Sequence, residues 1–444
     1  MLIPERLLLA LPPQAAKIFV ANHHHHSVIH RAFFKPLTEQ LALCSHQRKC
    51  ETVEDSRWLE IGVRRCLSAS QSGRDFLQYL SDCHDIDIEV ETYFETLKSK
   101  RRLSLAGELN SKLRLRMRAD IDDPFARFAS LDDFEIFAGD GHFHAASCHD
   151  SSPTAKKYPT GHLFSLDLRC HALTHLTVGD QVARKVEHDM RALKRLDAEA
   201  LRQGVPQGWR VGRKVLYVWD RAGIDFKQWH DWKYKSAIYF LSREKKNMEL
   251  TVVKANPFDK DDPINENVLS DEMCESADGM AVRRVVYHDV VNDRIFSFLT
   301  NLPVSVPPGL VAYLYKCRWD IEKVFDELKN KFQETKAWAK SATAKSNQAQ
   351  MLCLTHNLLT LMESDLEKTE GIRNEAEWKR KAKTLEQTRE YLAEHGHSLP
   401  WLYEAIQRIT QRSVKFIRWL RNHLDSQAPW SQSLAALTKI YAKQ

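Results

Sequence analysis

Residues 313–331 read YLYKCRWDIEKVFDELKNK. Apolar residues recur here at spacings of three and four, which predicts a helix over 311–332 with one buried stripe. A second set keeps the same spacing one residue later, so it lines the edge of that stripe, rotated by about 100°. The stripe comprises Leu314, Cys317, Ile321, Val324 and Leu328, and the edge set comprises Tyr315, Arg318, Glu322, Phe325 and Lys329.

Glu322 is the acid of this edge, and it has two interpretations. Arg318 lies one helical turn before it and can pair with it. Such pairs are common on the surface of helices, where they contribute little to stability. The alternative is a metal ligand, which would need further acids, because two-metal phosphoryl transfer uses several carboxylates.

Two aspartates follow apolar runs that predict strands. Asp140 comes after FEIFAG and before Gly141, and Asp220 comes after KVLYVW and before Arg221. The ends of strands are suitable places for catalytic carboxylates, although an aspartate there is also an ordinary turn residue. Four other aspartates follow apolar strands less directly, namely Asp132, Asp133, Asp150 and Asp225.

The pattern along the chain predicts an α/β core with a β-rich insertion and helical flanks. The expected parts are a helical DNA-binding domain at 1–128, the core at 129–232 and 303–362, the insertion at 233–302, and a helical domain at 363–444. Within the insertion, four strands are expected around a polar, acidic stretch at 257–278.

The N-terminal part combines a possible helix-turn-helix with basic residues. Apolar residues at helical spacing break near 84–87 and resume at Val90. Two basic clusters then follow within about twenty residues, a density that suits phosphate contacts, although each cluster could equally be a solvated helix face. The candidate DNA contacts are Arg101, Arg102, Arg114 and Arg116.

A basic C-terminal stretch has the same two interpretations. It contains Arg408, Arg412, Lys415, Arg418 and Arg421. These residues could contact DNA or a second protomer, but packing of a helix on its own domain is favoured.

Composition limits the class of protein. The chain has 444 residues and a formal charge of +6, which fits a polyanion partner without establishing one. Its nine cysteines include no C-x2-C pair, which favours reduced thiols in a cytoplasmic setting. No run of 18 apolar residues occurs, so a membrane protein is not expected.

The spacing Tyr315-x2-Arg318-x3-Glu322-x6-Lys329 resembles, without a gap, the Y-x2-R-x3-E-x6-K signature of bacterial insertion-sequence DDE transposases of the Tn-type cut-and-paste group. The resemblance extends over about 70–360. It implies an RNase H-like catalytic core with a β-strand insertion between the second aspartate and the glutamate.

The resemblance also implies roles for residues. Asp140, Asp220 and Glu322 correspond to the catalytic acids, which hold two Mg²⁺ ions for which Mn²⁺ can substitute. Tyr315, Arg318 and Lys329 correspond to residues that grip DNA phosphates. The implied partners are double-stranded DNA, as transposon end and as target, and a second copy of the chain in a synaptic complex. The implied location is the bacterial cytoplasm, at the nucleoid.

The sequence departs from the family pattern in three places. Gly-His follows the first aspartate, the second begins D-R-A-G-I, and no tryptophan occurs within 233–318 to stack on a flipped base. Aromatic substitutes would be Tyr239, Phe240, Tyr287, Phe296 or Phe298. Two alternatives stay open, a catalytically idle DNA-binding protein of the same origin and an RNase H-like nuclease that hydrolyses DNA without joining it.

Overall fold

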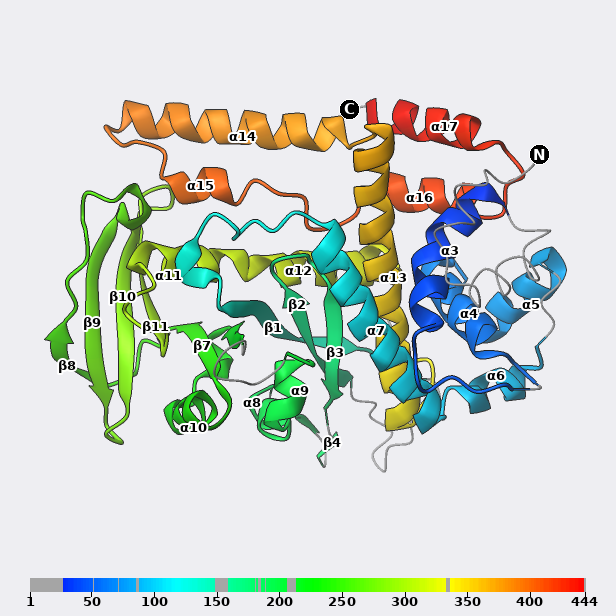
Figure 1. Cartoon of the computed structure of the whole chain (residues 1–444), viewed down its shortest axis with the longest axis horizontal. Coiled ribbons are helices and arrows are strands. Elements are labelled where there is room, and N and C mark those ends of the chain that lie inside the picture. Colours follow the sequence, from blue (N-terminus) through cyan, green and yellow to red (C-terminus); the bar gives the residue numbers. More distant parts are fainter. Residues whose placement is uncertain are drawn as a thin grey trace.

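The central feature of the fold is one large mixed β-sheet. A computed structural model describes residues 27–442, apart from 51, 71, 85–87, 148–158, 180, 183–184, 188, 206–212 and 333–335. Within these residues, nine strands form the sheet, in the order β3-β2-β1-β6-β7-β11-β10-β9-β8 (Figure 1). The strands are β1 Phe134–His144, β2 Thr160–Asp167, β3 Leu173–Val178, β6 Lys214–Val218, β7 Ile238–Arg243, β8 Leu250–Ala255, β9 Val268–Ser276, β10 Ala281–Asp289 and β11 Arg294–Thr300. A separate pair comprises β4 Gln181–Val182 and β5 Lys185–Val186.

The pairing of the strands changes between parallel and antiparallel across the sheet. β1, β6 and β7 are parallel, whereas β3, β2 and β1 pair antiparallel at one side. On the other side β11, β10, β9 and β8 continue from β7 as antiparallel strands. The part β3-β2-β1-β6-β7 is consistent with the expected RNase H-like core, and the four added strands extend the same sheet.

Helices surround the sheet and build the two ends of the molecule. Before the sheet lie α3 Val28–Leu41, α4 Asp55–Leu67, α5 Gly73–His84, α6 Val90–Thr96 and α7 Lys100–Asp120. Between its strands lie α8 Asp189–Lys194, α9 Ala198–Arg202 and α10 Phe226–Ser236. After the sheet come α11 Pro308–Cys317, α12 Trp319–Asp326, a π-helical turn at Glu327–Lys331, α13 Ala342–Glu370, α14 Glu375–Glu394, α15 Trp401–Ala405, α16 Val414–His423 and α17 Trp430–Ala442. Short 3₁₀ turns occur at Ala129–Leu131, Arg221–Gly223 and Pro263–Asn265.

Alternation along the strands separates two hydrophobic cores. Ile136 and Ala138 of β1 face a large core that includes α7 and α11–α13, while Phe137 between them faces a smaller core under α10. In β6, Leu216 faces the large core and Tyr217 the small one. Since side chains alternate with a period of two, residue parity decides which core each strand residue meets.

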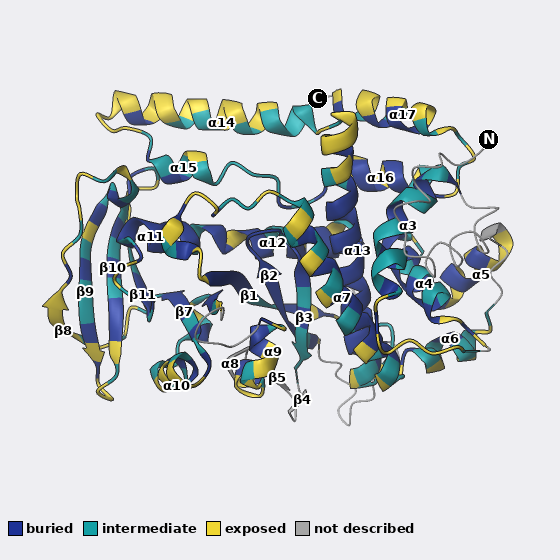
Figure 2. Ribbon diagram, in the orientation of Figure 1, coloured by how far each residue is buried: buried dark blue, intermediate teal, exposed yellow. Residues whose placement is uncertain are grey.

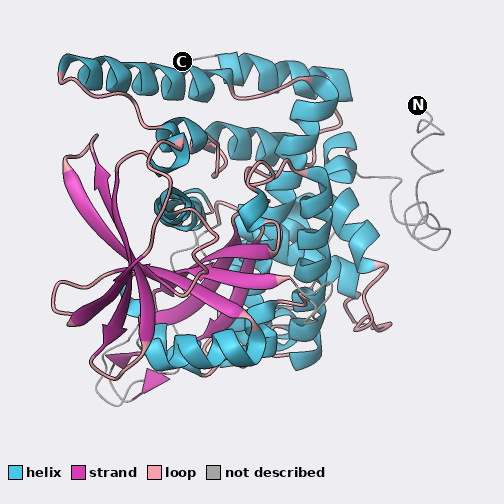
Figure 3. Cartoon of the chain, turned by 60° about the vertical axis from the view of Figure 1, so that its left-hand side comes forward, coloured by secondary structure: helices cyan, strands magenta, loops and turns pink. Residues whose placement is uncertain are grey.

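Helix α13 packs against both the sheet and the N-terminal helices. It contacts β3 on one side and α3 and α4 on the other, and it stands between the sheet and α3–α6 in Figure 1. Helix α7 packs along α13 and also contacts β3. Most of its length is buried, whereas α14 is exposed along much of its length (Figure 2). Figure 3 shows the strands on one side of the molecule and most helices on the other. No helix among the described residues is both long and apolar enough to span a membrane.

Most of the expected elements are present. The five residues of the predicted stripe are all buried, and 308–331 is helical except for one residue of turn at Arg318. The stretch 257–278, expected as a polar, acidic stretch between two strands, contains β9 itself. β7 falls within the predicted insertion but pairs in parallel with β6, as a core strand does. The break of the possible helix-turn-helix, at 85–87, lies outside the described residues. The domain boundaries stay predictions.

The contact between the insertion and α11 permits a first test of the fold. A Cβ atom on Gly309 would lie 1.6 Å from the backbone oxygen of Ile264. Gly309→Ala is therefore expected to lower the free energy of unfolding by about 2 kcal/mol or more, because backbone must move to admit the methyl group. The measurement is a urea unfolding curve.

The matched control is Gly107→Ala in α7, where the nearest atom to the new Cβ lies 3.8 Å away. This change should be neutral or stabilising by up to about 1 kcal/mol, as is usual for glycine within a helix. Equal effects of the two substitutions would contradict the tight packing of α11 on residues 263–265.

Candidate active site

The register of the parallel strands brings Asp140 and Asp220 together. Ala138 of β1 pairs with Val218 of β6, and each aspartate lies two residues beyond that pair. Neighbouring strands are about 4.8 Å apart, and equal parity puts both side chains on the same face of the sheet. This is the face of the large core, against which α12 packs.

The prediction that the strand ends at Asp140 is wrong. β1 continues beyond Asp140 to His144, because β2 pairs with it through this region, with Asp140 opposite Phe164 and Gly141 opposite Leu163. Asp140 is therefore a strand residue just past the last pair with β6. Asp220 does leave its strand, since its carboxylate accepts the amide N–H of Ala222 at 2.7 Å and caps a 3₁₀ turn.

Glu322 reaches the same place from α12 through Arg318. The guanidinium of Arg318 donates to Asp140 at 3.1 Å and to Glu322 at 2.5 Å. Arg318 is 7% exposed, whereas the side chain of Glu322 is 34% exposed. One buried guanidinium therefore links Glu322 to Asp140, and Asp220 lies beside Asp140 on the same face of the sheet.

Burial and the neighbouring charges affect the ionisation of Asp140. Burial raises the pKa of Asp140 to about 6, and the carboxylates of Asp220 and Glu322 add to this rise while Arg318 opposes it. Three acids that influence one another in this way are typical of sites that bind cations.

The donor chemistry fits a hard divalent cation, since all three side chains offer carboxylate oxygens. The present arrangement of these side chains does not fit a bound cation. Among the described residues, no three His, Cys, Asp or Glu side chains are placed to hold a metal ion. Arg318 lies between Asp140 and Glu322, so a cation would need this guanidinium to move.

The transposase DDE domain family matches residues 133–358, just over half of the chain. The chain belongs to this DDE transposase family. A search among curated proteins found no match. The family implies an RNase H-like core and an enzyme that acts on DNA, and DDE transposases generally use divalent metal ions.

The other residues of the signature lie beside the acids of the transposase. Tyr315 is half-buried, with its ring centroid 4.9 Å from that of Phe298 and 5.8 Å from the Arg318 guanidinium carbon. Lys329 is exposed in the π-helical turn, close enough to His142 to lower the pKa of that imidazole, although burial is the larger cause. Tyr315 therefore adjoins Arg318, and Lys329 lies near His142, two residues beyond Asp140 on β1.

Three arginines that lie near one another, one of them next to Asp220, were missed in the sequence. Arg221 follows Asp220, Arg243 ends β7 and Arg294 begins β11. None of them has an ion-pair partner within the described part of the chain, and burial together with the charges of Arg221 and Arg294 lowers the pKa of Arg243. The Arg243 guanidinium carbon lies 4.5 Å from the ring centroid of Phe296. We call these three residues the basic patch. Only the adjacency of Arg221 to Asp220 was visible in the sequence.

The predicted DNA contacts of the N-terminal part have partners within the protein. Arg102 and Arg114 are each 5% exposed, Arg102 against Asp55 and Arg114 against Asp167. These two pack the helical region, so we do not retain them as DNA contacts. Arg101 and Arg116 are partly exposed in their ion pairs, and their contact with DNA stays a prediction.

Most candidates for the missing tryptophan are inaccessible. Phe240, Tyr287 and Phe298 are buried, whereas Tyr239 and Phe296 are only partly buried. Phe296 is the candidate that lies beside the basic patch.

Four histidines form a buried row next to Asp140. His142 and His144 belong to β1, His162 to β2 and His175 to β3. Neighbouring ring centroids are 5.2, 4.8 and 5.2 Å apart along the row. Burial lowers the pKa of His142 to about 4, of His144 to about 3 and of His175 to about 4, and that of His162 well below its usual value. The row is thus uncharged at neutral pH.

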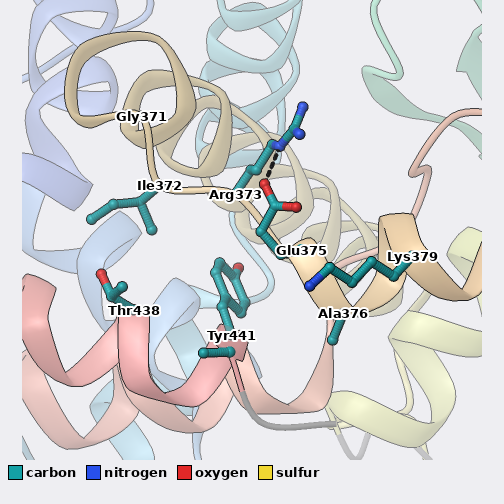
Figure 4. A pocket seen from close by; sticks show the side chains of 9 residues that line it. Gly371, Ile372, Arg373, Glu375, Ala376, Lys379, Thr438 and Tyr441 are labelled. Atoms are coloured by element: carbon teal, nitrogen blue, oxygen red, sulfur yellow. Dashed lines mark hydrogen bonds and ion pairs between the residues drawn. The ribbon is translucent and has the colours of Figure 1, made fainter.

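A shallow pocket occurs elsewhere, where the end of α13 meets α14 and α17 (Figure 4). Its lining includes Arg373, which pairs with Glu375, and Tyr441, whose hydroxyl donates to Glu363 at 2.7 Å. None of the predicted site residues lines it. We assign it no role in the chemistry.

Proposed function

We propose that this transposase binds the inverted repeats at the ends of its element, cuts the DNA there and joins the freed ends to a target. The observation that carries the proposal is the convergence of Asp140, Asp220 and Glu322, with Arg318 between two of them. Tyr315 and Lys329 beside this cluster complete the family signature. The cut-and-paste route is the form of transposition that the signature favours.

Asp140, Asp220 and Glu322 would hold the divalent cations, Mg²⁺ or Mn²⁺. Bound cations of this kind lower the pKa of water and offset charge on a phosphodiester and its leaving oxygen. For these cations to bind, Arg318 would have to exchange Asp140 and Glu322 for another anion, and a DNA phosphate is suitable because a guanidinium can donate two hydrogen bonds to it.

The reaction is phosphoryl transfer without a covalent enzyme intermediate. Water attacks the phosphorus at the end of the element, the bond to the 3′ oxygen breaks, and a free 3′ hydroxyl results. In the joining step this hydroxyl attacks a target phosphodiester, whose own 3′ oxygen leaves. Arg318, Lys329 and Tyr315 hold the phosphates in place, since cationic and hydroxyl donors position the backbone without reading sequence.

Two ends must be cut in one complex, so we propose that a second copy of the chain takes part. The site of action would be the bacterial nucleoid. The idle DNA-binding protein and the hydrolytic nuclease are the alternatives. Intact acids argue against the first, and the presence or absence of joined products separates the second.

The test is cleavage of a plasmid that carries the DNA flanking the gene, with Mg²⁺, Mn²⁺ or EDTA. A transposase releases a fragment that ends at the inverted repeats, only with metal, and yields joined products when target DNA is added. Cleavage without joining would identify a nuclease. Binding without cleavage in either metal would identify the idle protein.

We expect the basic patch to contribute a measurable part of the DNA affinity by neutralising phosphates. Each neutralised phosphate contributes about 0.9 to the slope of log affinity against log salt concentration. Arg243→Ala is therefore expected to reduce that slope by about 1 and to weaken binding at low salt. The measurement is fluorescence anisotropy with an inverted-repeat duplex over a range of salt concentrations.

The matched control is Arg284→Ala on the neighbouring strand β10. Arg284 is paired with Glu272 at 2.7 Å and lies 3.8 Å from Glu244, so its charge is already compensated. Its removal should leave the salt slope unchanged. If Arg243→Ala and the unaltered protein show the same slope, Arg243 does not contact a DNA phosphate.

A further inference from the structure

The helix that carries Glu322 has a second polar edge. Asp320 and Glu327 are seven residues apart, which brings them to nearly the same side of a helix, and Glu322 is about 200° away from Asp320 around the axis. Asp320 is 3% exposed and Glu327 is fully buried. These two acids therefore face away from the catalytic edge, toward other protein.

The protein that they face is the segment 406–413, which connects α15 to α16. Asp320 forms an ion pair with Arg408, and it also accepts from Lys323 at 3.0 Å. Glu327 accepts the backbone N–H of Arg412. Both ends of α12 are thus held by one short connection that is more than 80 residues away along the chain.

Glu327 has a second buried partner. Its carboxylate lies 2.7 Å from Nδ1 of His356 on α13, whose Nε2 lies 3.0 Å from the backbone oxygen of His171. Both ring nitrogens of His356 are therefore engaged within the protein. The helix is therefore tied to α13 as well as to the connection.

The contacts continue along the π-helical turn. Lys331 donates to Gln411 at 2.6 Å and to the backbone oxygen of Arg412 at 2.7 Å. Arg421 of α16 donates to the backbone oxygen of Lys331 at 2.8 Å. The guanidinium of Arg412 pairs in turn with Glu363 of α13 at 2.8 Å.

Buried ion pairs of this kind are poor sources of stability, because desolvation offsets most of their attraction, but they can specify one arrangement of packed elements. A π-helical turn often occurs at a functional site and changes the phase of the residues that follow. Here the turn begins five residues after Glu322 and contains Lys329. The rotation of α12 about its own axis decides where Glu322 reaches, and the buried acids on its rear side determine that rotation.

We propose that the segment 406–413 is a positioning element for the catalytic helix. It holds the helix through Arg408, which pairs with Asp320, and through the backbone N–H of Arg412, which donates to Glu327. The proposal rests on the proposed role of Glu322. It assigns Arg408 and Arg412 to the interior of the protein, in agreement with the favoured interpretation of the basic C-terminal stretch.

The test removes the ion pair without leaving a buried charge. The double variant Asp320→Asn/Arg408→Gln is compared with Glu404→Gln/Arg389→Gln, which neutralises a surface pair of 2.9 Å between α14 and α15. Hydrogen exchange of the amides of 319–331 is measured by mass spectrometry, with α7 as the internal reference. The Mn²⁺ concentration for half-maximal cleavage and the affinity for DNA are measured alongside.

In the test variant, exchange of 319–331 should become about tenfold faster while α7 is unchanged, since local opening is separate from global unfolding. The half-maximal Mn²⁺ concentration should rise about tenfold, as when a supporting partner of a ligand is removed. DNA affinity should stay within about twofold, because the DNA-facing edge is intact. Arg408→Lys, which retains the charge, should behave nearly as the unaltered protein, and so should the control variant.

Unchanged exchange in 319–331 would overturn the positioning role, whatever the cleavage assay gives. Faster exchange with an unchanged Mn²⁺ dependence would also overturn it, since the helix would then loosen without moving a ligand. If the unaltered protein never cleaves DNA, the proposed function fails, and faster exchange would still support the coupling of α12 to 406–413.

Discussion

Glu322→Gln is expected to lower the rate of DNA cleavage by at least about a thousandfold, equivalent to about 4 kcal/mol in the barrier, while DNA binding is retained. The amide keeps the shape of the side chain but lacks the charge that a divalent cation needs. Stability should change little, because the side chain of Glu322 is 34% exposed. The measurement is the initial rate of plasmid cleavage in Mn²⁺, together with the dissociation constant for an inverted-repeat duplex.

The control for this substitution is Asp326→Asn on the same helix. Asp326 is exposed, and among the described residues its carboxylate accepts only from Asn330, at 2.6 Å, so this variant should cleave DNA at nearly the unaltered rate. Equal cleavage by Glu322→Gln and the unaltered enzyme would make Glu322 an ordinary partner of Arg318. Loss of cleavage in Asp326→Asn as well would show that any loss of charge on α12 is harmful.

Acidification from pH 6.8 to 5.2 is expected to destabilise the transposase by a few kcal/mol. The folded-state pKa of His142, His144 and His175 is lowered to about 4, 3 and 4. In this interval the unfolded chain binds protons at these histidines and the folded chain does not. The free energy of unfolding therefore falls as pH falls, by about 1.4 kcal/mol per pH unit for each histidine that titrates only when unfolded.

The sign reverses for Asp140, whose pKa is raised to about 6. The folded state takes up a proton there before the unfolded state does, which offsets part of the loss. Other carboxylates titrate mainly below this interval when unfolded. The charge of Lys329 opposes protonation of His142, and that of Lys345 opposes protonation of His162.

His144→Leu isolates the contribution of the row. Neither ring nitrogen of His144 has a hydrogen-bond partner in the described part of the chain, so leucine leaves no polar group there unpaired. Its urea unfolding curves should show a pH slope shallower by about 1.4 kcal/mol per pH unit. His395→Gln, at an exposed position, is the control and should keep the original slope. An unchanged slope in His144→Leu would mean that His144 is protonated equally in the folded and unfolded chain.

Local patterns were sufficient for much of the fold. The stripe from Leu314 to Leu328 predicted a helix over 311–332, and the structure has a helical run over 308–331. The pattern was sufficient because apolar residues at spacings of three and four are a property of the sequence itself. β9 was not predicted, because Asp271 is buried there by its contact with Arg283 of β10, a partner that no local pattern contains. The continuation of β1 past Gly141 likewise depends on β2, through a pairing between distant segments.

The candidate site divides in the same way. The sequence by itself determined the identity and spacing of Tyr315, Arg318, Glu322 and Lys329, and the two strands whose acids could join them, since these are features of one helix and of two apolar runs. The tertiary structure alone decided that Arg318 bridges two acids, that Arg102 and Arg114 are buried rather than open to DNA, and that Arg408 holds α12 from behind. The sequence alone shows which residues are charged, whereas the partner that compensates each charge depends on packing between segments far apart along the chain.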